Sequence, residues 1–167
     1  MKDVYDVDKY FIKNDADSFP NTYEGNMKLQ SFLVFANMIN VAEYGELLFD
    51  DVLALKDDCF VEKIRLSYES DKFEQDFSDS EYTVLNMVMS IFKSASAKEL
   101  SEITHALKFW KEPDCPYKSK SIIHDEDIDR MKEIVHAYQE SSNDVMTREI
   151  INGISFWLNR YIGDLLT

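Results

Sequence analysis

Residues 28–38 read Lys-Leu-Gln-Ser-Phe-Leu-Val-Phe-Ala-Asn-Met, a run dominated by apolar side chains. Several of them recur at the three- and four-residue spacing of a helix: Leu29, Phe32, Leu33 and Ala36. The residues between them widen the apolar arc to most of the circumference, and Gln30 and Asn37 are the polar exceptions. A helix that is apolar nearly all round belongs inside a domain. We therefore predict a buried central helix over residues 27–43 that ends near Gly45.

The composition favours one mainly α-helical domain. A chain of 167 residues is long enough to bury a core without disulfides or metals. Its 11 Phe, 9 Tyr and 2 Trp supply apolar area for that core. Only 4 Gly and 3 Pro are present, too few for an all-β chain with many tight turns. We predict a mainly α, compact, multi-helix single domain packed around the central helix.

The rest of the chain divides into further helices. Residues 4–13 have the pattern of a short amphipathic helix, residues 14–26 that of a polar loop, and residues 61–69 that of another helix. Asp125 is predicted to cap a helix that runs through Tyr138. Two capping boxes, each a Ser followed three residues later by a Glu, are predicted to open helices: Ser78 to Glu81 and Ser96 to Glu99.

Residues 46–60 allow two interpretations. Apolar residues alternate there with the acidic pairs Asp50-Asp51 and Asp57-Asp58. Short extended pieces, forming a small β-hairpin, fit this pattern as well as another helix does.

The C-terminal part, residues 141–167, is predicted to add an amphipathic helix to a helical domain of residues 1–140. Its apolar residues form one stripe: Met146, Ile150, Ile154, Trp157, Tyr161 and Leu165. A stripe of this size would be a large apolar patch in water. We expect it to be covered by the domain itself or by a second copy in a homodimer.

The charge balance points to a basic protein partner. The chain has 18 basic and 32 acidic residues, a net charge of −14. Such a surface repels phosphate, so we expect no direct binding of DNA or RNA, although carboxylates can imitate nucleic acid. The sequence shows no signal segment and no apolar run of the roughly 18 residues that span a membrane. With two isolated cysteines, Cys59 and Cys115, the expected location is the cytoplasm.

No catalytic, metal or cofactor site is predicted. His105, Cys115 and His124 do not have the spacing of zinc ligands. Asp125 begins a pattern like that of a calcium loop, but Arg130 stands where that loop needs a glycine. Motifs that require clustered glycines are absent.

Two groups of residues are candidates for partner binding. Thr104 and His105, with Trp110 nearby, either bond the loop backbone and fill the core or belong to a contact surface. The four acids Asp50, Asp51, Asp57 and Asp58 either contact a basic partner or belong to a solvated loop.

Several segments resemble the Panacea domain, a family found in phage-associated proteins and in a proteolytic-adaptor antitoxin. Residues 29–36, Leu-Gln-Ser-Phe-Leu-Val-Phe-Ala, are similar to its Leu-Gln-Lys-Leu-Leu-Tyr-Phe-Ala motif. Leu100, Thr104-His105 and Trp110 are similar to its Leu-x-x-x-Thr-His pattern with a nearby Trp. The resemblance extends over about residues 4–138. Its motif residues are Leu29, Gln30, Phe32, Leu33, Phe35, Ala36, Thr104, His105 and Trp110.

The resemblance implies a mainly helical protein without known catalysis that neutralises a toxin, by direct binding or by delivery to a Clp-type protease. The first hypothesis is therefore a toxin-neutralising antitoxin or proteolytic adaptor. A second is a phage-encoded inhibitor of a host defence nuclease that imitates nucleic acid. An enzyme is the third and least favoured.

Overall fold

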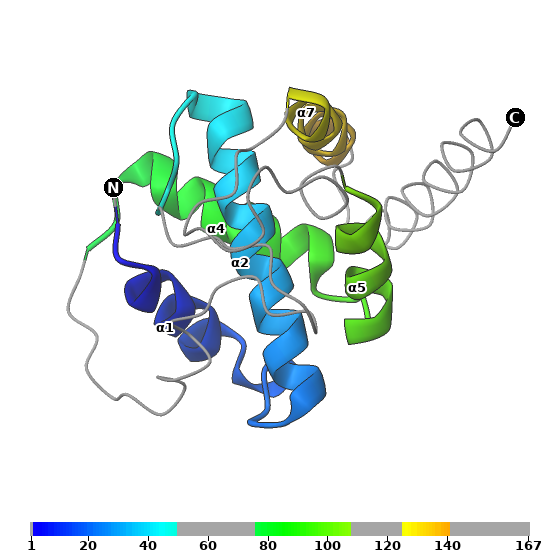
Figure 1. Cartoon of the computed structure of the whole chain (residues 1–167). Coiled ribbons are helices and arrows are strands. Elements are labelled where there is room, and N and C mark those ends of the chain that lie inside the picture. The colour runs from blue at the N-terminus through cyan, green and yellow to red at the C-terminus, as the bar shows by residue number, and fades with distance from the viewer. Residues whose placement is uncertain (1, 50–75, 108–124, 141–167) are drawn as a thin grey trace, which may run out of the picture.

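In the computed structural model, residues 2–49, 76–107 and 125–140 are described, and these residues contain helices and no strand. The prediction of a mainly α fold is confirmed. The elements, shown in Figure 1, are α1 (Val4–Asn14), the 3-10 helix η1 (Ala16–Ser18), α2 (Tyr23–Tyr44), α4 (Asp79–Phe92), α5 (Ala97–Ala106) and α7 (Asp125–Glu140).

Helix α2 is the predicted central helix. It crosses the middle of the molecule and packs against α1, α4, α5 and α7 (Figure 1). Every residue from 29 to 40 is buried, as a helix that is apolar nearly all round requires. The C-terminal end was predicted correctly, because α2 stops at Tyr44 and Gly45 follows in the left-handed conformation with φ 75°.

The N-terminal end of α2 was predicted wrongly. The helix begins at Tyr23, four residues before the predicted start, because the Thr22 side chain accepts a hydrogen bond from the Gly25 N–H at 3.1 Å. The Pro20 carbonyl comes so close that a Cβ on Gly25 would lie 1.9 Å from its oxygen. A glycine that resembles a loop residue in the sequence is thus a helical residue that permits a close backbone contact.

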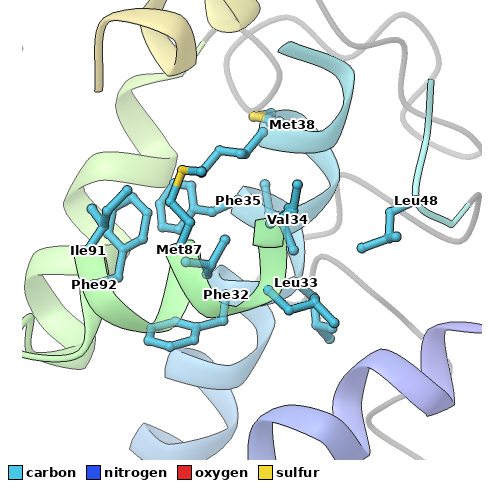
Figure 2. Close-up of a cluster of buried hydrophobic side chains, with 14 of the residues drawn as sticks. Phe32, Leu33, Val34, Phe35, Met38, Leu48, Met87, Ile91 and Phe92 are labelled. Atoms are coloured by element: carbon cyan, nitrogen blue, oxygen red, sulfur yellow. The ribbon is translucent and has the colours of Figure 1, made fainter. Parts of the chain in front are cut away.

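Aromatic side chains link α2 to its neighbours. The Phe35 and Phe92 rings stack, with centroids 4.2 Å apart and an interplanar angle of 11°, and join α2 to α4. Phe32 meets Phe11 of α1 edge to face at 5.5 Å, and Phe19 in the same way at 5.0 Å. Figure 2 shows Phe32, Phe35 and Phe92 in this core, with Met38 and Met87 beside them. Such contacts add to the stabilisation from apolar burial.

Both predicted capping boxes are present. The Ser78 N–H donates to Glu81 Oε1 at 2.7 Å, and the Glu81 N–H donates back to Ser78 Oγ at 3.3 Å. The same pair of bonds joins Ser96 and Glu99, each at 3.1 Å. They fix where α4 and α5 begin. Helix α7 starts at Asp125 itself, with Glu126 and Asp127 in its acidic first turn.

Several predictions concern residues outside the described part of the chain. These are the helix over 61–69, the larger part of the possible hairpin (50–60), and the C-terminal helix over 141–167. Residues 46–49, which are described, contain no strand.

Candidate partner-binding site

The predicted candidates Thr104 and His105 lie in the last turn of α5. Thr104 is fully buried, and its hydroxyl donates to the carbonyls of Leu100 at 3.1 Å and Ser101 at 3.0 Å. These bonds run within its own helix, and the loop of the alternative interpretation lies outside the described residues. A threonine hydroxyl reaches the carbonyls one turn back more easily than any loop. His105 is half-buried.

The other predicted site residues lie outside the described residues: Asp50, Asp51, Asp57, Asp58 and Trp110. The structure therefore leaves their role in partner binding as a prediction.

Two asparagines on α2, Asn37 and Asn40, bind the backbone of the segment that follows the helix. Asn37 is buried, and its Oδ1 accepts from the backbone N–H of Leu48 at 2.8 Å and of Phe49 at 3.3 Å. Its Nδ2 donates to the Phe49 carbonyl at 3.0 Å. One turn later, Asn40 Nδ2 donates to the Glu46 carbonyl at 2.8 Å. The two amides hold the chain back against α2 after the helix ends, and Figure 2 shows Leu48 pointing toward the helix.

This return of the chain creates an exposed feature that sequence reasoning missed. We call residues 43–47, Glu-Tyr-Gly-Glu-Leu, the α2 exit turn. Tyr44 is 46% exposed and Leu47 is 37% exposed, and Glu43 and Glu46 are exposed beside them. The glycine at position 45 could have indicated this feature from the sequence. A left-handed glycine after a helix reverses the chain and turns neighbouring side chains outward.

A pocket of about 320 Å³ adjoins the α2 exit turn. It lies where the end of α2 meets the start of α4. The described residues that line it are Lys2, Asn40, Tyr44, Glu46, Leu47, Leu48, Ser78, Ser80 and Glu81.

Lys2 forms one wall of this pocket and is already engaged. Its backbone N–H donates to the Leu48 carbonyl at 2.7 Å, and its Nζ donates to the Asp76 carbonyl at 2.9 Å. The same ammonium lies 3.7 Å from Glu81 Oε1 and 5.7 Å from the centroid of the Phe77 ring. Within the described part of the chain, by contrast, the Glu43 and Glu46 carboxylates have no ion pair. The pocket edge is therefore a place of unmatched negative charge.

A second, more open pocket of about 770 Å³ lies between the ends of α1 and α4, where Asn14, Asn86 and Ser90 line it. Near it, Lys28 Nζ donates to the Lys93 carbonyl at the end of α4, at 3.0 Å. Burial lowers the pKa of Lys28, and the nearby Asp15 charge opposes that effect. Lys28 thus provides a hydrogen-bond donor to a carbonyl group at the C-terminal end of α4, which is a structural role.

Among the described residues, the largest pKa shift belongs to Asp8 in α1, away from both pockets. Asp8 is 1% exposed, and its Oδ1 has no hydrogen-bond partner among the described residues. Burial raises the pKa of this carboxyl to about 7, against a smaller opposing effect of Lys9. Across the described ranges, no three His, Cys, Asp or Glu side chains come together as a metal site. No helix in those ranges is long and apolar enough to cross a membrane.

Comparison with known families gives a match over part of the chain. Residues 51–111, just over a third of the chain, match the family described as Antitoxin SocA-like, Panacea domain. The matched family is the one that the sequence resembles, over a shorter stretch than residues 4–138. Thr104, His105 and Trp110 lie inside the match, and α4 and α5 are its described part, whereas the 29–36 motif lies outside it. No curated protein and no solved structure gave a significant match.

Proposed function

We propose, from the antitoxin-type Panacea segment at residues 51–111, that this protein is a non-catalytic regulator that binds and neutralises a basic protein toxin. The family match is the observation that carries this proposal. It suggests a protein partner of toxin type, and the charge of the chain suggests the chemistry of that partner.

The electrostatics support a basic partner. A net charge of −14 repels anions at long range and attracts a cationic protein, which chiefly raises the association rate. Exposed carboxylates such as those of Glu43 and Glu46 are available for that attraction. Because exposed charges are screened by salt, association should slow as the ionic strength rises.

The test begins with a small reading frame beside this gene, where the proposal expects the toxin to be encoded. Its product, expressed alone, should stop growth, and co-expression of this protein should restore it. Purified protein should inhibit the purified toxin in proportion to the amount added. Inhibition that continues to grow with time at a small fraction of the toxin concentration would show an enzyme and overturn the proposal.

Delivery to a Clp-type protease is the alternative way to neutralise such a toxin. It predicts that the toxin becomes short-lived when the two proteins are co-expressed, and that growth rescue requires the protease. Direct inhibition predicts an unchanged toxin half-life and rescue in a strain without the protease.

The acids beyond the α2 exit turn provide a direct test of charge. Reversing Asp57 and Asp58 to Lys should slow association with the toxin at low salt while the protein stays folded. Reversing Asp17 and Glu24 together, two exposed acids in η1 and the first turn of α2, changes the net charge equally and is the matched control. Equal association rates for both variants would place the contact elsewhere.

A further inference from the structure

We infer that the pocket beside the α2 exit turn is a docking site for a basic, partly apolar segment of a protein partner. The segment would place a Lys or Arg side chain at Glu46 and an apolar side chain against Tyr44 and Leu47. Identifying that partner as the toxin rests on the proposed function, but the site itself does not.

The first argument is the exposure of apolar side chains. Among the described residues, the large hydrophobic side chains that are exposed are Tyr23, Tyr44 and Leu47. Two of these stand within four residues of each other, and both line the same pocket. A tyrosine at the edge of a pocket is a frequent anchor of protein interfaces, because it buries a large area with few rotatable bonds.

The second argument is the charge. Glu46 lines the pocket and Glu43 lies one turn away on the exit turn. Lys2, the lysine in the pocket wall, is held by the Asp76 carbonyl and by Glu81, so the exit-turn acids remain available. An exposed ion pair contributes little affinity. The lining of the pocket is mostly polar, so apolar contact would come from the exposed surfaces of Tyr44 and Leu47 at its rim. The acids would select a cationic segment and orient it.

The third argument is that the site is rigid. The Asn40 side chain holds the Glu46 carbonyl, Asn37 holds Leu48, and the Lys2 backbone N–H bonds the Leu48 carbonyl. The exit turn is thus fixed to α2 on one side and to the N-terminal segment on the other. A site whose conformation is already fixed loses less entropy when a partner binds.

The experiment selects ligands for the full-length protein from a displayed library of random short peptides. The enriched peptides are expected to carry Lys or Arg next to aliphatic or aromatic residues. Tyr44→Ala should weaken their binding at least about tenfold, the effect of removing an interface aromatic. Glu46→Lys should weaken it as well and reduce its dependence on salt.

Tyr23→Ala and Glu24→Lys are the matched controls. They change the same residue types at the opposite end of α2, about 30 Å from Tyr44 at a rise of about 1.5 Å per residue. Both should bind the selected peptides like the unchanged protein. The inference is overturned if no peptide is enriched, if the enriched peptides are acidic, or if Tyr44→Ala binds them unchanged.

Growth rescue separates this inference from the proposed function. Peptide binding that depends on Tyr44, without any toxin rescued, supports the docking site and overturns the proposed function. Toxin rescue by a protein that binds no peptide through Tyr44 overturns the docking site alone.

Discussion

The side chain of Asn37 forms hydrogen bonds with both backbone groups of Phe49, accepting from its N–H at 3.3 Å and donating to its carbonyl at 3.0 Å. Phe49 is fully buried, so water cannot replace these bonds. The central helix therefore holds the chain that follows it through one amide, and the α2 exit turn depends on that contact. A buried polar side chain is tolerated on this apolar helix because it forms hydrogen bonds with buried backbone groups.

Replacing Asn37 by Ala should lower the free energy of unfolding by at least about 2 kcal/mol, because each buried backbone group left unpaired costs about 1–3 kcal/mol. Asn40→Ala, which removes one partly buried bond, is the control and should cost about 1 kcal/mol. Urea unfolding measures both values. Hydrogen exchange at the Leu48 and Phe49 amides should become faster in Asn37→Ala, and unchanged exchange there would contradict the assigned role.

The Phe35–Phe92 stack should be a main support of the α2–α4 contact. Phe35→Ala should cost about 3–5 kcal/mol, and Leu33→Ala about 2–5 kcal/mol, since both side chains are fully buried. A double-mutant cycle on Phe35 and Phe92 should give a coupling of about 0.5–1.5 kcal/mol. Tyr23→Ala, at a side chain 66% exposed, should change stability by less than about 0.5 kcal/mol. Parent-like melting of Phe35→Ala would mean that α2 is not the core helix.

Asp8 should make stability fall as the pH rises. Its folded pKa of about 7 exceeds the ordinary value of 3.8, so the folded state holds the proton more tightly than the unfolded state. Its favourable contribution is complete below about pH 4 and is lost as the pH rises through about 7. Asp8→Asn, which cannot ionise, should remove this loss. The free energy of unfolding of Asp8→Asn, relative to that of the unchanged protein, should therefore rise by about 2–4 kcal/mol between about pH 4 and pH 8.

Urea unfolding across that pH range measures the gain. Asp17→Asn, at an exposed aspartate of η1, is the control and should follow the unchanged protein at every pH. If the Asp8→Asn and unchanged curves run parallel, the Asp8 carboxyl does not titrate in this range.

The capping box at the start of α5 provides a local test. Ser96→Ala removes the side chain that accepts the Glu99 N–H and should cost about 1 kcal/mol. Ser96→Gly should cost only a few tenths of a kcal/mol, because glycine is itself tolerated at this position. Thermal unfolding of both variants distinguishes a cap from a general effect of losing the serine. An equal loss of stability in Ser96→Ala and Ser96→Gly would argue against a capping role for Ser96.

Part of the site was open to prediction and part was not. The end of α2 at Gly45 follows from residue type, so a chain reversal near residues 43–47 was predictable. The exposure of Tyr44 and Leu47 was not, because apolar residues next to a buried helix are ordinarily expected in the core. The engagement of Lys2 was not predictable either, because it depends on Asp76 and Glu81, far away in sequence.

The sequence by itself determined the elements whose cause is local. The apolar run of residues 28–38 defined the central helix, and the serine–glutamate pairs defined where α4 and α5 begin. Side chains within a few residues of each other set these features, so the sequence contains the whole cause. Only the tertiary structure decided that Asp8 is buried with an unbonded oxygen and that Asn37 holds Phe49. It alone also placed a pocket between the end of α2 and the start of α4, because burial and long-range bonds depend on which segments pack together.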